Sequence, residues 1–215
     1  MTDHRMRIPL QAVILDYGNV LSRPQRRAEV EGMAEVLKAP VARFEELYWK
    51  YRQAFDEAAL SPEAYWEGVA RGLSRELPAA ALERLTELDN ISWADANPAM
   101  LAWARGLRGA GVRTAVLSNM PVTLRTYLSS QPWFPEFDFA CYSCDVRSAK
   151  PAPEIFRHCL EGLRVAASEA LFLDDREENI DGARKLGIHT IYFGSPAEAQ
   201  GEIDRRYSLP VRLTV

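Results

Sequence analysis

The chain has 215 residues, 47% of them hydrophobic, and its 26 Lys and Arg against 30 Asp and Glu give a formal net charge of −4 at pH 7. This length suits one large domain, or a medium-sized domain with an insertion, and the composition is that of a folded globular protein. A mildly acidic chain lacks the positive charge typical of nucleic-acid-binding proteins. Its apolar runs are also far shorter than the roughly 20 residues that span a bilayer. We therefore expect neither nucleic acid nor membrane as a partner.

The N-terminus and the cysteines indicate a cytoplasmic protein. Residues 1–11 contain neither the apolar segment nor the small-residue cleavage site of a secretory signal. Three cysteines are an odd number, which does not suggest a set of disulfides. Cys141 and Cys144 form a C-x-x-C pair without a second pair at the spacing of a zinc site, so we expect structural thiols.

The first predicted strand spans residues 12–15 and ends at Asp16. From about residue 25 to residue 107, apolar residues recur at the i, i+3, i+4 spacing of amphipathic helices. Within this segment, Ser61 followed by Pro62 has the form of a helix N-cap with proline at the first helical position. The segment is predicted to be several helices with no strand between them.

After residue 112, predicted strands alternate with helices. The strands are expected at 113–117, 137–142, 170–173 and 189–193, and the helices after Pro121, at 151–163 and at 180–186. Repeated strand–helix units imply an α/β fold, with a Rossmann-like doubly wound parallel sheet that has helices on both faces. We assign residues 1–21 and 100–215 to this α/β core and residues 22–99 to an inserted α-helical cap. Alternating apolar residues (Val211, Leu213, Val215) predict an edge strand at 207–215.

Polar side chains stand where the predicted strands end. Asp16, Ser118, Asp174 and Asp175 each follow a strand, and Lys150 precedes a predicted helix. In open α/β sheets, ligands bind outside the carboxyl ends of the strands, so we expect these side chains to share one edge. A carboxylate nucleophile, a hydroxyl, a cation and a carboxylate metal site are the groups that phosphoryl transfer requires.

Each of these residues also has a purely structural interpretation. Asp16 could begin a turn, Ser118 could cap the next helix, and Lys150 alone could be a surface lysine. Asp175 and Glu178 have the spacing of a capping box. Their order and common position favour the functional interpretation. Because adjacent buried carboxylates repel each other, we expect a divalent cation between Asp16 and Asp175.

Four motifs resemble those of the haloacid dehalogenase-like hydrolase superfamily. They are residues 13–20 (VILDYGNV), 116–119 (VLSN), 148–151 (SAKP) and 172–183 (FLDDREENIDGA). The insertion directly after the first motif is similar to the helical cap of the type I members. The motifs are most similar to those of the subgroup that contains glucose-1-phosphate phosphatase.

This resemblance implies a nucleophile and a metal site. Asp16 would attack phosphorus and become an aspartyl-phosphate. Mg²⁺ would be held by the side chains of Asp16 and Asp175 and by the backbone carbonyl of Gly18, and Asp174 would orient a water of its coordination shell.

The resemblance also implies how a small phosphorylated metabolite would bind. Ser118 and the backbone N–H of Asn119 would contact the phosphate oxygens, helped by the positive end of the following helix. Lys150 would offset the crowded negative charge. Tyr17 and Gly18, next to the nucleophile, would lie at the substrate.

Gly18 is the main departure from the family pattern. Most phosphatases of the superfamily have a second aspartate there, which acts as general acid and then as general base. Losing such a group commonly costs about 10²–10⁴ in rate. Either the leaving group is intrinsically good, as an anomeric sugar hydroxyl or an acyl group is, or another residue supplies or orients the proton. Arg147 is a smaller departure that would add positive charge near the site.

The cap is expected to close over the substrate and to set specificity. Its aromatic side chains, which include Tyr48, Trp49 and Trp66, are expected to be core residues rather than substrate contacts. The basic residues Arg23, Arg26 and Arg27 are expected to form a solvated face.

Three functions remain open from the sequence. The first is a Mg²⁺-dependent phosphatase acting on a small phosphomonoester, such as a sugar 1-phosphate. The second is a metal-independent 2-haloacid dehalogenase, in which Asp16 attacks carbon. The third is a catalytically weak member that binds a phosphorylated ligand or a protein partner. No feature specifies an oligomeric state.

Overall fold

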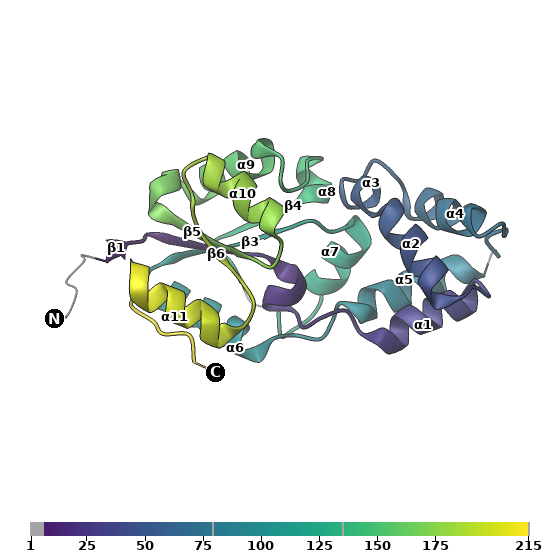
Figure 1. Cartoon of the computed structure of the whole chain (residues 1–215), viewed down its shortest axis with the longest axis horizontal. Helices are drawn as coiled ribbons and strands as arrows, with labels where there is room; N and C mark the ends of the chain where they lie inside the picture. Colours follow the sequence, from purple (N-terminus) through teal and green to yellow (C-terminus); the bar gives the residue numbers. More distant parts are fainter. Residues whose placement is uncertain (1–6, 79, 135, 215) are drawn as a thin grey trace.

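The computed structural model describes residues 7–78, 80–134 and 136–214. At one end of the molecule lies a sheet with helices on both faces, and at the other end lies a group of helices (Figure 1). The five strands of the sheet are all parallel and have the order β4-β3-β2-β5-β6. Their bounds are β2 (Ala12–Leu15), β3 (Arg113–Ser118), β4 (Phe139–Tyr142), β5 (Ala170–Asp174) and β6 (His189–Tyr192). The doubly wound α/β fold is confirmed.

Helices cover both faces of this sheet. Six of them are α6 (Pro98–Gly109), α7 (Val122–Ser129), α8 (Ser143–Val146), α9 (Pro153–Leu163), α10 (Glu177–Lys185) and α11 (Pro196–Arg206), with the short turn η2 (Ala167–Glu169) before β5. Because successive side chains of a strand point to opposite faces, Val13 packs with residues of α6, α7 and α11, and Ile14 packs with residues of α9 and α10. All four residues of β2 are buried, as expected of a central parallel strand.

The helical insertion between β2 and β3, called the cap below, has a hydrophobic cluster of its own. It comprises α1 (Arg27–Val36), α2 (Val41–Lys50), α3 (Arg52–Asp56), α4 (Pro62–Gly72) and α5 (Ala81–Ser92). The Ser61 side chain accepts a hydrogen bond from the Ala64 N–H at 3.2 Å, which confirms the predicted N-cap. The chain enters and leaves this segment side by side, with Ser22 bridged to Ala96.

One local prediction is wrong. The C-terminal strand is limited to β7 (Tyr207–Ser208), which pairs in parallel with β1 (Ile8–Pro9). Beyond it, backbone groups bond to side chains instead of a strand: the Val211 carbonyl accepts a hydrogen bond from Trp103 Nε1 at 3.0 Å, and the Leu213 N–H donates to Gln200. Val215 lies outside the described residues.

The alternative interpretation of Asp175 and Glu178 as a capping box does not hold for helix α10. This helix begins at Glu177, and its N-cap residue, Arg176, makes no capping hydrogen bond with its side chain. The Arg176 N–H donates instead to Asp174 at 2.9 Å. The second aspartate is therefore left to the site rather than to the helix end.

Two further features bear on the class of protein. None of the described helices has the length and apolar character that crossing a membrane requires. All three cysteines are buried and free.

Candidate active site

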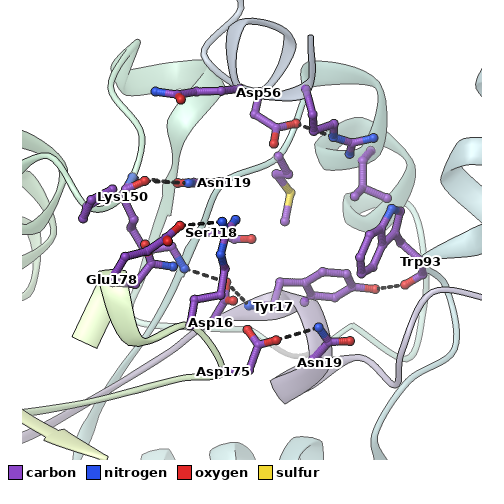
Figure 2. Close-up of a pocket in the computed structure, with 18 of the residues that line it drawn as sticks. Asp16, Tyr17, Asn19, Asp56, Trp93, Ser118, Asn119, Lys150, Asp175 and Glu178 are labelled. Carbon is purple, nitrogen blue, oxygen red and sulfur yellow. Dashed lines mark hydrogen bonds and ion pairs between the residues drawn. The ribbon is translucent and has the colours of Figure 1, made fainter. Parts of the chain in front are cut away.

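A cavity of about 610 Å³ lies between the carboxyl ends of the strands and the cap. The strand order reverses between β2 and β5, which is where ligands bind in open α/β sheets. Of the site residues that the sequence predicts, all but Asp174 line this cavity: Asp16, Tyr17, Gly18, Ser118, Asn119, Lys150 and Asp175. The structure therefore brings together residues that are up to about 160 positions apart in the chain, on a scaffold of rigid strands (Figure 2).

Lys150 lies at the centre of the acidic residues. Its Nζ is 2.7 Å from Asp16 Oδ1 and 2.7 Å from Asp174 Oδ2, and it donates to the Leu117 carbonyl at 2.9 Å. Burial lowers the pKa of Lys150, but the two carboxylates outweigh burial and raise this pKa above its ordinary value. The lysine is therefore a fixed cation rather than a surface residue.

Asp16 follows β2 directly and is anchored at one oxygen. Oδ1 pairs with the Lys150 ammonium and accepts a hydrogen bond from the Tyr17 N–H at 2.7 Å. Oδ2 accepts no hydrogen bond from the described residues. Burial raises the pKa of Asp16 to about 7; Lys150 opposes this effect and Asp174 adds to it. One oxygen is thus held in place while the other is free to react.

Asp16, Asp174 and Asp175 form an acidic cluster whose carboxylate oxygens lie within 4.8 Å of one another. Hard divalent cations prefer such oxygen ligands. When all three carboxylates are ionised, they and the one ammonium have a charge of −3 + 1 = −2, which matches a divalent cation. The donor set and the charge both fit a Mg²⁺ site.

The three carboxylates are not equally available to such a cation. Asp174 is fully buried, and its two oxygens already receive Lys150, the Arg176 N–H and the Asn179 amide. Asp175 is only half-buried and lines the cavity. Asp16 and Asp175 therefore face the cavity, and Asp174 lies behind them as the partner of Lys150.

The turn after Asp16 orients Asp175. This turn, η1 (Tyr17–Leu21), is interrupted at Gly18 and at Asn19, whose φ of 58° lies in the left-handed region that asparagine tolerates. The Asn19 Nδ2 donates to Asp175 Oδ2 at 2.7 Å (Figure 2). Asn19 belongs to the first motif, but the sequence alone assigns it no role.

At Gly18, an indole ring faces the missing side chain. A Cβ built at Gly18 would lie 3.6 Å from Trp93 Cζ3. The Tyr17 hydroxyl donates to the Trp93 carbonyl at 2.7 Å, which ties this tryptophan to the turn that follows the nucleophile. Tyr17 is almost fully buried, so it lines the cavity while its hydroxyl is used internally.

Ser118 is the last residue of β3, and Asn119 follows it on the way to α7. The Ser118 hydroxyl makes no hydrogen bond within the described part of the chain, and α7 begins after Pro121 without a side-chain cap, so Ser118 is not a capping residue there. The Asn119 side chain accepts from the Lys150 N–H at 2.8 Å and donates to the Lys150 carbonyl at 3.0 Å. Asn119 therefore positions the backbone of Lys150. The Ser118 hydroxyl is available to a ligand.

The cap contributes residues to the cavity that sequence reasoning missed. They are Trp49, Arg52, Gln53 and Asp56, together with Trp93 at the end of the cap. Arg52 and Asp56 stand four residues apart on one short helix, a spacing that is common on helix surfaces and therefore gives no functional signal in the sequence.

Other expectations for the cap are met in part. Tyr48, Phe55, Tyr65 and Trp66 are buried core residues as predicted, but Trp49 is 50% exposed at the cavity. Exposed Arg26 and Arg27 pair with glutamates on the cap surface, consistent with a solvated face. Arg147 is exposed and is not part of the cavity lining.

Comparison with known proteins identifies the family. A family model described as haloacid dehalogenase-like hydrolase matches residues 10–187. The chain belongs to this family. Phosphatase MT3486 of Mycobacterium tuberculosis is 25% identical over 205 residues, which cover 93% of this chain and 94% of that protein.

Other relatives are much longer proteins. Acyl-CoA dehydrogenase family member 10 of Mus musculus is 37% identical over 123 residues, which cover 55% of this chain and 11% of that protein. Bifunctional epoxide hydrolase 2 of Rattus norvegicus is 38% identical over 69 residues, which cover 32% of this chain and 12% of that protein. The chain thus spans only about a tenth of the length of these two relatives.

Solved structures share the fold. A HAD-like family hydrolase from Porphyromonas gingivalis has a TM-score of 0.71 at 21% identity, covering 92% of this chain and 98% of that one. HAD family enzyme BT-2542 from Bacteroides thetaiotaomicron, in complex with magnesium and inorganic phosphate, has a TM-score of 0.68 at 21% identity. The match covers 85% of this chain and 93% of that one. The L-2-haloacid dehalogenase PA0810 has a TM-score of 0.65 at 17% identity, and the match covers 96% of this chain and 91% of that one.

Proposed function

We propose that this protein is a Mg²⁺-dependent phosphatase that hydrolyses a small phosphomonoester through an aspartyl-phosphate at Asp16. The observation that carries the proposal is the acidic cluster of Asp16, Asp174 and Asp175 beside Lys150, facing the cavity with a charge of −2. The phosphatase MT3486, which matches this chain over nearly its whole length, and the magnesium and phosphate bound to BT-2542 support the proposal.

The roles of the chain's own residues follow from their contacts. Asp16 Oδ2, which is free of hydrogen bonds within the described residues, attacks phosphorus, and the ester P–O bond breaks as the leaving group departs. Water then cleaves the aspartyl-phosphate, which releases inorganic phosphate and restores the carboxylate. Lys150 holds Asp16 in position, and the Ser118 hydroxyl binds a phosphate oxygen.

Asp16, Asp175 and the Gly18 carbonyl are the groups that would hold Mg²⁺. When bound, the ion supplies positive charge that offsets the charge of the phosphoryl oxygens. Asn19 orients Asp175 for this role, and Asp174 fixes Lys150. We assign the Asn119 backbone N–H to a second phosphate oxygen, since the Asn119 side chain is already bonded to Lys150.

The glycine at position 18 favours a substrate whose leaving group departs without much help from a proton donor. An anomeric sugar oxygen or an acyl oxygen is a better leaving group than a simple alkoxide, so a sugar 1-phosphate is the favoured substrate. The resemblance of the motifs to those of glucose-1-phosphate phosphatase points to the same class.

A 2-haloacid dehalogenase is the second candidate. In that reaction Asp16 attacks carbon, halide leaves, and no metal is needed; the absence of a side chain at Gly18 is compatible with this chemistry. The acidic cluster favours the phosphatase because a dehalogenase has no use for a site of charge −2. The third candidate, a weak phospho-ligand binder, differs from both in lacking turnover.

The test is phosphate release from a panel that contains p-nitrophenyl phosphate, sugar 1-phosphates, acetyl phosphate and simple alkyl phosphates. Each substrate is assayed with Mg²⁺, with EDTA, and with the Asp16→Asn variant. We expect release that requires Mg²⁺, falls at least about 10³-fold in Asp16→Asn and favours good leaving groups. Halide release from 2-haloacids in EDTA would instead establish the dehalogenase. Silence on both panels by a folded protein that still binds Mg²⁺ would establish the binder.

A further inference from the structure

Asp56 is a buried carboxylate that reaches the cavity from the cap and has no part in the acidic cluster. It is the last residue of α3, is 7% exposed, and lines the cavity. Figure 2 shows it across the cavity from Asp16 and Asp175. A substrate whose phosphate lies at Asp16 would therefore direct the rest of its structure toward Asp56.

One oxygen of this carboxylate is free. Asp56 Oδ1 accepts from Arg52 Nε at 2.8 Å, whereas Oδ2 accepts no hydrogen bond from the described residues. Oδ2 is not among the fully buried side-chain atoms that lack a hydrogen-bond partner, so it keeps some exposure at the cavity wall. A carboxylate oxygen in this position can accept a hydrogen bond from a donor of the ligand.

Asp56 is also tied to the core. The Ser143 hydroxyl, from α8, donates to the Asp56 carbonyl at 2.6 Å and accepts from the Met120 N–H at 3.0 Å. Met120 follows Ser118 and Asn119, the residues assigned above to the phosphate. The distance from the phosphate end of the cavity to Asp56 is therefore set by hydrogen bonds rather than by a loose loop.

The charged residues on the cap side of the cavity have a net negative charge. Arg52 is shared between Asp56 and Asp89, with Nη1 at 3.0 Å from Asp89 Oδ1, so this group has a charge of +1 − 2 = −1. The other two cations that line the cavity are also paired: Lys150 with Asp16 and Asp174, and Arg176 with Glu178. A second phosphate or a carboxylate would thus meet negative charge.

An exposed aromatic ring completes this end of the cavity. Trp49, half exposed, lies edge-to-face with Trp93 at a centroid distance of 6.4 Å, and both line the cavity. Flat aromatic faces contact the apolar C–H surfaces of ring compounds without requiring charge. The cap thus offers an aromatic surface and a hydrogen-bond acceptor to the leaving group.

We propose that Asp56 selects the leaving group: its free carboxylate oxygen accepts a hydrogen bond from a hydroxyl of an uncharged, polyhydroxylated leaving group, and the cap charges reject a substrate with a second anionic group. This inference rests on the phosphatase function proposed above and adds the residue that determines specificity.

The experiment compares three matched substrates and one reporter. Glucose 1-phosphate carries hydroxyls, cyclohexyl phosphate has a ring of the same size without them, and glucose 1,6-bisphosphate adds a second anion; p-nitrophenyl phosphate reports basal activity. The variants are Asp56→Asn and, as the matched control, Asp89→Asn, which removes the same charge next to Arg52 from a residue that does not line the cavity. Folding is checked by thermal unfolding.

We expect wild type to prefer glucose 1-phosphate over the bisphosphate by at least about tenfold in kcat/KM. Asp56→Asn lowers kcat/KM for glucose 1-phosphate by about 10- to 100-fold, the range of a hydrogen bond to a charged group. The same variant changes kcat/KM for cyclohexyl phosphate and p-nitrophenyl phosphate by no more than about twofold. It also reduces the ratio of kcat/KM for glucose 1-phosphate to that for the bisphosphate. Asp89→Asn leaves the ratio of glucose 1-phosphate to cyclohexyl phosphate unchanged.

Two results would overturn the assignment of Asp56 while leaving the phosphatase intact. One is an equal loss on every substrate in Asp56→Asn, which would make the residue structural. The other is a wild type that hydrolyses the bisphosphate or cyclohexyl phosphate as well as glucose 1-phosphate. A wild type that is silent even on p-nitrophenyl phosphate would overturn the proposed function itself, and the inference with it.

Discussion

Two groups of buried charges face each other across the cavity, and they are built differently. The core charge cluster (Asp16, Lys150, Asp174, Asp175) has one cation among three carboxylates and a charge of −2. In the cap charge cluster (Arg52, Asp56, Asp89), two carboxylates share one cation. Arg52 Nε contacts Asp56, and Arg52 Nη1 contacts Asp89 and the Tyr48 hydroxyl, which in turn donates to Asp89 at 2.6 Å.

This difference agrees with the two proposed roles: the core cluster for the reaction and the cap cluster for substrate specificity. The core cluster has a net negative charge despite Lys150, so the proposed phosphatase function would require a divalent cation from solution. The cap cluster satisfies most of its own hydrogen bonds and presents a single acceptor to the cavity. Buried polar groups that are almost fully paired favour a unique geometry, which suits a specificity determinant.

The largest expected effect is on stability, and it tests whether the two clusters differ in their need for metal. Lys150→Met and Arg52→Met each leave two or more buried carboxylates without their cation, which costs about 3–5 kcal/mol in the free energy of unfolding. Mg²⁺ should restore part of the loss in Lys150→Met, because it binds the folded site, and none in Arg52→Met.

Urea unfolding of both variants in EDTA and in Mg²⁺ measures this difference, with wild type as the reference. Equal recovery of the two variants in Mg²⁺, or no recovery of Lys150→Met, would contradict the view that only the core cluster accepts a cation.

The second prediction concerns the pH dependence of the cap cluster. Burial raises the pKa of Asp56 from 3.8 to about 6, although Arg52 opposes this effect. The folded state therefore binds the Asp56 proton more tightly than the unfolded state. The stabilisation that this proton gives is complete below about pH 4 and is lost as the pH rises through 6. Between pH 4 and pH 7, the free energy of unfolding should fall by about 2.5 kcal/mol more in wild type than in Asp56→Asn, because the Asp56 pKa differs by about 2 between the folded and unfolded states.

Urea unfolding at half-unit pH steps gives this difference directly. Asp181→Asn, at an exposed aspartate on α10, serves as the control. A difference between wild type and Asp56→Asn that stays constant from pH 4 to pH 7 would show that the carboxylate is not held against its burial.

The third prediction returns to the core cluster and to the residue that orients Asp175. Asn19→Gly removes the amide that donates to Asp175 Oδ2, while glycine tolerates the φ of 58° at this position. The Mg²⁺ concentration for half-maximal activity should rise by about 10- to 100-fold, as is typical when a group that orients a metal ligand is lost. Activity at saturating Mg²⁺ should be largely restored.

Ser74→Gly is the matched control, since Ser74 has a similar φ of 57° but lies on the exposed surface of the cap. An Asn19→Gly enzyme with unchanged Mg²⁺ dependence would remove Asn19 from the metal site.

The smallest expected effect concerns the contact between the two regions. Ser143→Ala removes the hydroxyl that joins the Asp56 carbonyl to the Met120 N–H, at a cost of about 1 kcal/mol. KM for the preferred substrate should rise about fivefold with little change in kcat, because the cap is held less firmly over the cavity. Ser61→Ala, which removes an N-cap at a comparable cost in stability, should leave KM unchanged. Equal behaviour of the two variants would make Ser143 a residue of stability alone.

Much of the core could be predicted because its signals are local. A four-residue apolar run followed by the turn at Asp16 to Gly18 is typical of a buried strand, and strand–helix alternation after residue 112 allows few topologies besides a parallel sheet. The predicted strand at 12–15 matches β2, and α9 and α10 lie where their apolar periodicity places them. The C-terminal tail was mispredicted because alternation of Val211 and Leu213 describes burial, not hydrogen bonding, and the partners of this backbone are distant side chains.

The candidate site divides in the same way. The motifs identified Asp16, Ser118, Lys150 and the two aspartates at the end of β5, because parallel strands bring their carboxyl ends to one edge in any such fold. They did not indicate that Asp174 serves Lys150 while Asp175 faces the cavity, since that depends on which oxygens the Arg176 N–H and Asn179 reach.

The sequence by itself thus determined the family, the sheet and the reacting edge, each of which follows from short segments and general rules of chain topology. Only the tertiary structure decided what faces that edge. Trp49, Arg52, Asp56 and Asp89 come from three separate helices of the cap, and Ser143 joins them to the core across 87 positions of sequence. These residues come together only through the packing of the helices, and the sequence pattern of a single segment does not predict that packing.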